Sequence, residues 1–451
     1  MHALRQVDPK QVARLAVGLG VAFFFVGLWL ALRHVVGLVP WEPNLTVDFD
    51  YYATAGQMLA RGEDPYAAYI HLRETLESGG YPYPPLLAWA LVPLVTTLPA
   101  RWHYLVWVIA EVAVFAASLT MVLRAGRAPV AWHWVVLIVG AAFLPYFTWY
   151  NLYHGQVDFI LLLLIAGGVC LLAKDRPIAA GILFALAANV KPFLAILLLY
   201  LAWRSRWRAF FAMGFAGAAI LIGSFLPTIP QHGLAVVEGW IGASRAMGQP
   251  PFTGFPFNNS VYGTLVRLVT PTPFAVPWVE SQTLLIVLTA LFGLIVPVVW
   301  LRAIPPGRLR PDTDVVTVGL VETGMLLTLM FAWGPIAEAN HLIVLWPVML
   351  VTLRLALASP DPAQRLRWRP AALGWGLFLL LTAGPIRQLT WTEPLEGVPE
   401  GIAVLFTGRV GVLLLIAGLT TAWSLAQEHR VSRPYLSLRT TLGRWREPRA
   451  A

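Results

Sequence analysis

The chain has 451 residues, of which 58% are hydrophobic and only 12% are charged, and its mean hydropathy is +0.68. A water-soluble protein carries about twice that share of charged residues, so the composition excludes a soluble globular fold and indicates a multi-pass membrane protein. The net charge of +9 would favour a nucleic-acid partner in a soluble protein, but these arginines lie between apolar segments, as topology anchors do. We therefore expect membrane lipids and no nucleic acid around this chain.

Apolar segments of helical length follow one another along the chain. They lie at 12–32, 84–98, 102–123, 133–150, 156–173, 178–202, 208–228, 281–301, 314–334, 341–357, 371–388 and 402–426. The first has basic residues before it but no small-residue cleavage pattern, which favours a retained span over a removed signal peptide. Together the segments predict an all-α integral membrane bundle of about 12 transmembrane helices.

Two long polar connections divide what we interpret as a single membrane unit. The predicted parts are the first outer loop 33–83, the rest of a seven-helix core 84–228, the second outer loop 229–280, the C-terminal helices 281–426 and the basic tail 427–451. Arginine-rich links belong in the cytoplasm, which places both termini inside and both long loops outside. The basic residues of 84–202 disagree with the orientation that this simple count of spans gives. They would fit if 84–98 were a re-entrant helix and 178–202 a hairpin broken at Lys191-Pro192.

The first outer loop contains an amphipathic pattern. Apolar residues recur there at helical spacing, at Phe49, Tyr52, Ala53, Gly56, Leu59 and Ala60. They predict a helix that lies in the membrane interface and ends at Gly62. Asp48 stands at the start of this helix, where a carboxylate either caps free backbone amides or serves as a general base at the bilayer surface. Asp50 would point away from Asp48 on a helix, so only one of them can address a given site.

Several short motifs occur in an order that resembles a known family. They are Asp48-Phe49-x-x-Tyr52, Gly62-x-x-Pro65-Tyr66, Tyr81-x-Tyr83-Pro84-Pro85-Leu86, Gly155-Gln156-Val157-Asp158, Lys191-Pro192, Asn258-Asn259-Ser260 and Asn340-His341. The series is similar to glycosyltransferase family 87, a group of mannosyltransferase-like enzymes of the GT-C superfamily that use polyprenyl-phosphate sugars. Ala337-Glu338-Ala339 departs from it, because the family more often shows Ser-Trp there.

The resemblance implies a GT-C type bundle with a catalytic carboxylate in the first outer loop and a second large outer loop after seven helices. It favours Asp48 as the catalytic base, with Asp50 as the alternative. The candidates for binding the donor phosphate are Arg267, Lys191 and His341, of which the resemblance supports Arg267 and His341. The candidates for substrate binding are Asn259, Ser260, Tyr52, Tyr83 and Gln156.

The three phosphate-binding candidates each have a structural alternative. Arg267 suits a phosphate through its planar fork, but an interfacial arginine also snorkels toward lipid head groups. Lys191 lies inside an apolar segment, where ionisable groups are functional or paired; its structural partners would be Asp158 or carbonyls freed by Pro192. His341 could equally cap the start of a helix.

Further polar residues lie within or between the apolar segments. One group, between two of the segments, consists of Asn151, His154, Gln156 and Asp158. These residues could recognise sugar hydroxyls or brace helices, and the simple span count places them on the inner side, far from Asp48. Glu111 and Glu322 are intramembrane carboxylates that we expect to pair within the bundle.

These observations predict a glycosyltransferase in a prokaryotic plasma membrane, acting on its outer face. It would move one sugar, mannose first and arabinose second, from a polyprenyl phosphate to a glycolipid or glycan acceptor, with inversion. No metal-ligand spacing or nucleotide-binding loop occurs, so we expect no cofactor, and a divalent metal remains open. The alternative is a transporter or lipid flippase that would use Lys191, Asp158, Glu111 and Glu322 as an intramembrane polar track.

Overall fold

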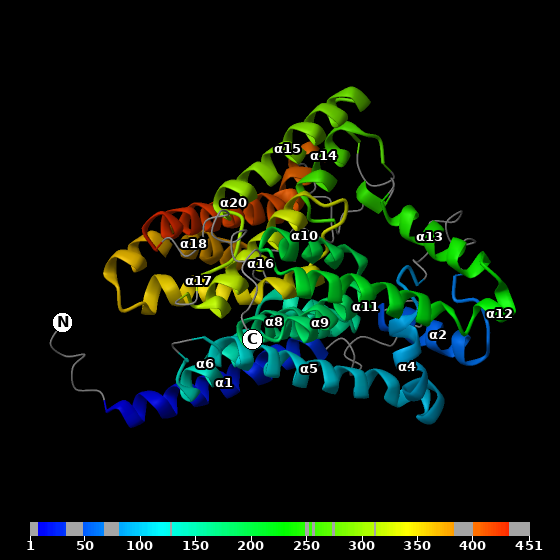
Figure 1. Ribbon diagram of the computed structural model, residues 1–451, viewed down its shortest axis with the longest axis horizontal. Helices are drawn as coiled ribbons and strands as arrows, with labels where there is room; N and C mark the ends of the chain where they lie inside the picture. The colour runs from blue at the N-terminus through cyan, green and yellow to red at the C-terminus, as the bar shows by residue number, and fades with distance from the viewer. Residues whose placement is uncertain are drawn as a thin grey trace, which may run out of the picture.

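A computed structural model describes residues 8–32, 48–66, 81–126, 129–248, 252–254, 258–272, 276–310, 313–382 and 400–432, with the side chains of the last range from 409 onward. This part of the chain consists of helices and turns and contains no strand. Figure 1 shows the helices packed side by side, with α2, α4, α12 and α13 gathered at one end of the bundle. The acidic segment 393–399 and the basic tail beyond 432 lie outside the described residues.

The first half of the chain supplies eleven of the described helices. They are α1 (Pro9–Leu32), α2 (Asp48–Ala60), α4 (Leu86–Thr97), α5 (Ala100–Arg124), α6 (Trp132–Ala141), α7 (Tyr146–His154), α8 (Asp158–Ala173), α9 (Pro177–Val190), η2 (Pro192–Ile196), α10 (Leu197–Trp203) and α11 (Trp207–Phe225).

The second half begins with short helices and continues with longer ones. They are α12 (Ile229–His232), α13 (Ala235–Met247), η3 (Phe252–Gly254), α14 (Val261–Val269), α15 (Gln282–Ala303), α16 (Val315–Trp333), η4 (Asn340–Leu345), α17 (Trp346–Ala358), α18 (Pro362–Leu381) and α20 (Glu400–Ser432). One continuous cluster of buried apolar side chains extends from α1 to α20.

The chain is a multi-pass membrane protein. Seven of the described helices are long and apolar enough to cross a membrane, or eight if the bent pair α6–α7 forms one span. The twelve expected segments all overlap helices, but four apolar helices have only 10–17 residues. At about 1.5 Å per residue, the 12 residues of α4 cannot cross a hydrocarbon core of about 30 Å. The prediction of about 12 transmembrane helices is therefore not confirmed.

Two breaks determine where polar turns lie inside the bundle. The chain bends by 69° between α6 and α7, and Pro145 stands directly before α7. α9 ends at Val190 because Pro192 pushes the preceding residue out of the helical region, and Lys191 is extended (φ −129°, ψ 108°). The chain is thus broken at Lys191-Pro192, as the alternative to the simple span count expected.

α2 is the amphipathic helix predicted in the first outer loop, and the chain turns at Gly62 (φ +73°) as expected. Its apolar residues are buried, except Ala60, which is exposed. They contact α4 closely at Gly56, where an added Cβ would lie 3.1 Å from the carbonyl oxygen of Ala88. The face expected to lie in the membrane interface is therefore covered largely by protein.

Parts of the two predicted outer loops touch each other. The His232 ring nitrogen Nε2 lies 2.8 Å from the carbonyl oxygen of Gly62, and the Ser244 hydroxyl donates to the carbonyl of Pro82 at 3.1 Å. These contacts join α12 to the residues that follow α2, and α13 to the residues that precede α4. They account for the grouping of these four helices at one end of the bundle (Figure 1).

Candidate functional site

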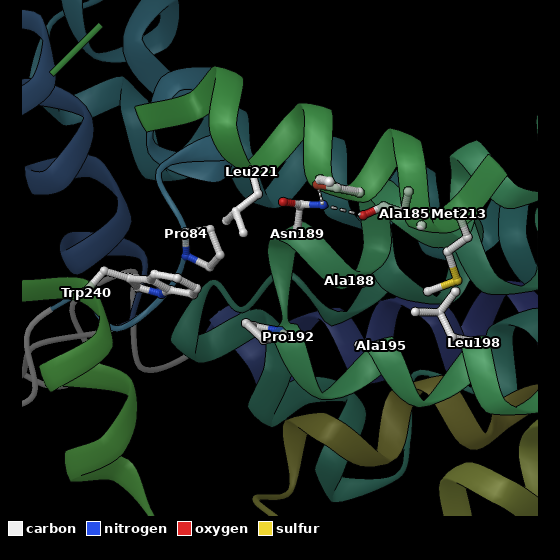
Figure 2. Close-up of a pocket in the computed structure, with 13 residues that line it drawn as sticks. Pro84, Ala185, Ala188, Asn189, Pro192, Ala195, Leu198, Met213, Leu221 and Trp240 are labelled. Carbon is white, nitrogen blue, oxygen red and sulfur yellow. Dashed lines mark hydrogen bonds between the residues drawn. The ribbon is translucent and has the colours of Figure 1, made fainter. Parts of the chain in front are cut away.

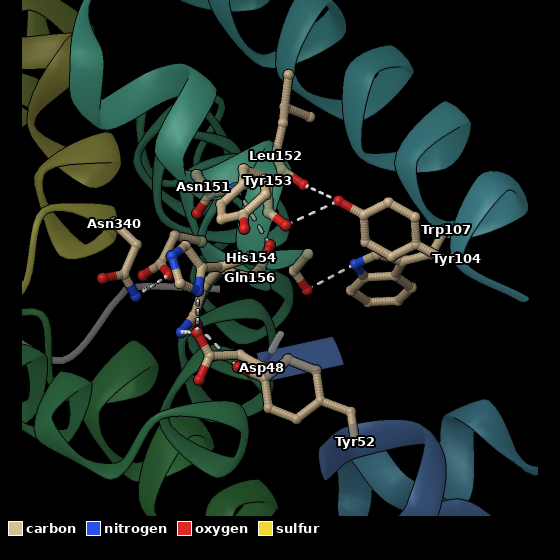
Figure 3. A network of polar contacts seen from close by, with 12 residues as sticks. Asp48, Tyr52, Tyr104, Trp107, Asn151, Leu152, Tyr153, His154, Gln156 and Asn340 are labelled. Atoms are coloured by element: carbon tan, nitrogen blue, oxygen red, sulfur yellow. Dashed lines mark hydrogen bonds and ion pairs between the residues drawn. The ribbon is translucent and has the colours of Figure 1, made fainter. Parts of the chain in front are cut away.

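The turn between α7 and α8 is shaped by Gly155. This residue ends α7 in the left-handed region (φ +62°), and a Cβ added to it would lie 2.6 Å from the Cβ of Phe49. α5 holds the turn from the other side. The Trp107 indole donates to the Gly155 carbonyl at 2.8 Å, and the Tyr104 hydroxyl donates to the carbonyl of Leu152 at 2.6 Å (Figure 3). A glycine and two aromatic donors thus fix the turn against the start of α2.

This turn presents two side chains to Asp48. Gln156 Nε2 donates a hydrogen bond of 2.6 Å to Asp48 Oδ2, and His154 Nδ1 lies 3.4 Å from the same oxygen (Figure 3). The Asp48 side chain remains 31% exposed, so one end of it is bound while water and small molecules still reach it. Asp50 lies on the exposed side of α2, as the helical spacing indicated.

The expectation that His154 and Gln156 lie far from Asp48 was wrong. The simple span count treated 133–150 as one straight crossing, whereas the chain bends by 69° between α6 and α7. Because of this bend, the C-terminal end of α7 points toward α2, and His154 and Gln156 contact Asp48 there.

Lys191 forms the buried part of the same cluster. Its ammonium donates to Asp158 Oδ2 at 2.7 Å and to Gln156 Oε1 at 3.2 Å, and both charged side chains are at most 1% exposed. The Tyr52 hydroxyl donates to the same Gln156 oxygen at 2.8 Å. Gln156 therefore connects the buried cation to the exposed carboxylate of Asp48 through the two ends of one amide.

Three tyrosines cover this cluster. The ring of Tyr83 lies 5.9 Å from that of Tyr52 and 5.8 Å from that of Tyr81, and its centroid is 5.9 Å from the Lys191 ammonium. Burial raises the pKa of Tyr52 and of Tyr83, and the charge of Asp48 adds to the effect on each. Both phenols therefore stay neutral and can donate hydrogen bonds at physiological pH.

The segment between α16 and η4 is pinned beside the cluster at two points. The Asn258 amide donates to the Pro335 carbonyl at 2.6 Å, and its oxygen accepts from the Ala337 backbone nitrogen at 3.0 Å. Further along, the Asn340 amide donates to Asp158 Oδ2 at 3.2 Å. The second outer loop and α8 thus hold this segment from opposite sides.

His341 follows this segment directly. Its Nδ1 accepts a hydrogen bond of 3.3 Å from the backbone nitrogen of Glu338. Its ring stacks on Phe331 at 5.6 Å and meets the edge of Phe193, two residues after Lys191, at 5.3 Å. The structure therefore brings His341 to the Lys191 side of the cluster.

Arg267, Asn259 and Ser260 lie one segment away. The Ser260 hydroxyl caps α14 by accepting from the Gly263 backbone nitrogen at 2.9 Å, and the Asn259 nitrogen donates to the Ala337 carbonyl at 2.7 Å. Arg267 donates to the Asn258 carbonyl at 3.1 Å, and burial lowers its pKa to about 10, so it remains a cation near neutrality. These contacts place the three residues around Asn258 and not around Asp48.

His154 and Asp158, which the sequence offered either for sugar recognition or for bracing helices, both lie in the cluster. Asn340 was absent from the predicted site, although it stands beside the predicted His341.

An apolar cavity of about 250 Å³ is lined mainly by residues of α9, η2 and α11. Pro84 and Trp240 lie at one end of it and Leu198 and Met213 at the other (Figure 2). Its one polar side chain is that of Asn189, whose amide nitrogen is bound to the carbonyls of Ala185 and Gly217. Pro192, the residue after Lys191, also lines the cavity, whereas Lys191 itself is not among its lining residues.

The helices and this cluster define a multi-pass membrane protein with a partly exposed carboxylate connected to a buried cation. The sequence model of glycosyltransferase family 87 matches residues 81–332, which is more than half of the chain. The chain therefore belongs to glycosyltransferase family 87 and is a membrane glycosyltransferase. The search of curated proteins found no match. The matched range contains Gln156, Lys191 and Arg267, whereas Asp48 and His341 lie outside it.

Proposed function

We propose that this glycosyltransferase takes a single sugar from a polyprenyl phosphate and transfers it to a glycolipid or glycan acceptor on the outer face of a prokaryotic plasma membrane. One observation carries the proposal. Gln156 binds Asp48 through its nitrogen and Lys191 through its oxygen, which sets a candidate base and a candidate phosphate-binding cation on either side of one amide.

The apolar cavity supports a lipid-linked donor. Its lining is almost entirely apolar and suits an isoprenoid chain, which has no hydrogen-bonding groups. Pro84 and Pro192, which line it, directly follow Tyr83 and Lys191 in the sequence, and on this basis we propose that a chain in the cavity has its phosphate on the Lys191 side. His341, on the same side, is a second candidate for the phosphate, and Arg267 is a third from the second outer loop.

The proposed reaction is a direct displacement with inversion. The acceptor hydroxyl loses its proton to Asp48 while its oxygen bonds to the anomeric carbon, and the bond from that carbon to the phosphate oxygen breaks with its electrons going to the phosphate. Lys191 stabilises the charge that develops on the phosphate, and this stabilisation is strong because the ammonium is shielded from water. Tyr52 and Tyr83 would contact the sugar. Mannose is the first choice and arabinose the second, and independence from metal stays a prediction.

The first experiment compares Asp48→Asn with Asp50→Asn in transfer of radiolabelled mannose or arabinose from a polyprenyl phosphate. Loss of a general base lowers a rate by about 10²- to 10⁴-fold, so we expect Asp48→Asn to lose transfer. Asp50→Asn is the matched control, because this exposed carboxylate is two residues away on the same helix, and it should keep near-normal transfer. Thermal unfolding in detergent checks that both variants are folded. Full transfer by a folded Asp48→Asn protein would disprove the role of Asp48.

The same protein preparation can distinguish the proposed glycosyltransferase from a transporter or flippase. The polar track that it would need includes Glu322, which is bound by Arg204, and Asp158, which is bound by Lys191. Proteoliposomes loaded with a fluorescent polyprenyl phosphate report its movement across the bilayer. Movement without sugar transfer to any acceptor would contradict the proposed reaction.

A further inference from the structure

We infer that the C-terminal turn of α7, residues 150–154, is an acceptor subsite in which His154 binds a hydroxyl next to the one that reacts at Asp48. The inference rests on the proposed function and deepens it, because it names the chemical class of the acceptor. A group that fits both residues carries two adjacent hydroxyls. The terminal sugar or cyclitol of a glycan or glycolipid has such a pair, and a simple lipid alcohol does not.

The Asp48 carboxylate is held by one of its two oxygens. Gln156 at 2.6 Å and His154 at 3.4 Å both address Oδ2. Figure 3 shows the other carboxylate oxygen, Oδ1, directed away from these two side chains. Oδ1 is thus the atom to which an acceptor hydroxyl would give its proton, while the contacts to Oδ2 keep the carboxylate in place.

The two sides of this carboxylate differ in burial. Behind Gln156 lies the Lys191 ammonium, whose side chain is 1% exposed, whereas the side chains of Asp48 and His154 are 31% and 23% exposed. A donor phosphate bound by Lys191 would occupy the buried side. An acceptor then has to approach from the exposed side, where it meets the His154 ring.

The His154 side chain is not what holds its own turn. The Asn151 side-chain amide donates to the Gln156 carbonyl at 3.1 Å, and the Tyr104 hydroxyl adds two hydrogen bonds to backbone carbonyls of this part of α7. Within the described residues, the polar and ring contacts of His154 are with Asp48 and with two tyrosines of its own helix. A ring in this position beside an accessible carboxylate suits a ligand better than it suits a bracing role.

The rings of this turn match the two kinds of surface that a sugar has. The His154 ring lies 4.1 Å from that of Tyr150 and 5.0 Å from that of Tyr153, and all three residues are half-buried. A pyranose packs its apolar C–H face on aromatic rings and keeps its hydroxyls at the edge. A hydroxyl both donates and accepts, so it can bind the second ring nitrogen of His154, Nε2, whichever nitrogen carries the proton.

The first test compares octyl α-mannopyranoside with octanol as acceptor of radiolabelled sugar from a polyprenyl phosphate. It uses the wild type, His154→Phe, His154→Gln and His133→Phe, and thermal unfolding in detergent checks that each is folded. Phenylalanine keeps an aromatic ring but cannot bind a hydroxyl, whereas glutamine keeps a donor and an acceptor. His133→Phe is the matched control, because His133 is also a half-buried histidine beside an aromatic ring, 5.2 Å from that of Trp134.

The expected result is a selective loss of acceptor affinity. His154→Phe should raise the KM for the mannoside about tenfold, the effect of one lost hydrogen bond, and leave the KM for the donor unchanged. His154→Gln should stay within about threefold of the wild type, since it restores that hydrogen bond. The control should match the wild type, and the wild type should prefer the mannoside to octanol by about tenfold in kcat/KM.

A second measurement does not depend on transfer. Saturation-transfer NMR of the purified protein with methyl α-mannopyranoside and with myo-inositol should show binding that weakens in His154→Phe and persists in His133→Phe. Binding that depends on His154, without sugar transfer to any acceptor, would refute the proposed function and leave the subsite intact. The inference is overturned if neither probe binds the wild type, if a folded His154→Phe keeps wild-type binding, if this variant raises the KM for donor and acceptor alike, or if octanol serves as well as the mannoside.

Discussion

The bundle contains two buried ion pairs that differ in how completely their polar atoms are bonded. In the pair of Arg204 and Glu322, all three guanidinium nitrogens are bonded, to Glu322 and to the carbonyls of Pro305 and Gly307. The Tyr200 hydroxyl adds a bond of 3.3 Å to the same carboxylate. Such a pair has little capacity for a ligand, and it connects α10 to α16.

The pair of Lys191 and Asp158 is less completely satisfied. Within the described residues, Asp158 Oδ1 and Asn340 Oδ1 are buried and have no hydrogen-bond partner. Lys191 also reaches Gln156, and through it the partly exposed Asp48. Unpaired buried oxygens are costly, and we take their presence beside an accessible carboxylate as support for the proposed site. Burial alone therefore does not distinguish the two pairs, whereas the completeness of their hydrogen bonding does.

Among the variants that test this comparison of the two pairs, the double variant Lys191→Met/Asp158→Asn should have the largest effect. Removing both charges avoids leaving one of them buried and unpaired, so we expect a folded protein with only a modest change in melting temperature. Sugar transfer should fall by about 10²- to 10³-fold, as expected when one electrostatic contact to the transition state is lost. A folded double variant with normal transfer would remove Lys191 from the site.

A smaller loss is expected for Gly155→Ala. Its Cβ would collide with Phe49 at 2.6 Å, and its positive φ adds strain, so the α7–α8 turn should shift relative to Asp48. A displacement of about 1 Å in a catalytic group costs up to 10²-fold in rate, and we expect about tenfold here. Gly233→Ala is the matched control, because Gly233 also has a positive φ (+61°) but nothing within 4 Å of the added Cβ. Equal transfer rates for both variants would contradict the positioning role of the turn.

The smallest effect on transfer is expected for Arg204→Met/Glu322→Gln. This double variant removes the fully hydrogen-bonded pair of Arg204 and Glu322 and leaves the Asp48 cluster intact. Sugar transfer per folded molecule should therefore stay within about twofold of the wild type. Its melting temperature should fall, because the carbonyls of Pro305 and Gly307 lose their donor. A loss of transfer as large as that of the Lys191 variant would erase the distinction between the two pairs.

Local patterns were sufficient for much of the helical structure. The apolar spacing after Asp48 predicted α2 and its end at Gly62, because amphipathic periodicity and glycine turns are properties of adjacent residues. Pro192 likewise predicted the break after α9. Hydropathy could not give the number of crossings, since a short helix, a bent pair and a full span have similar composition.

By itself, the sequence determined that this is a helical membrane protein and which segments are apolar, since both follow from composition and short-range periodicity. Only the tertiary structure decided which polar residues meet. Asp48 and Gln156 are 108 positions apart, and Asp158 and Asn340 are 182 apart. Their contacts depend on the direction of the chain after the bend between α6 and α7 and after Lys191. That direction is set by packing among distant helices, which no local pattern records.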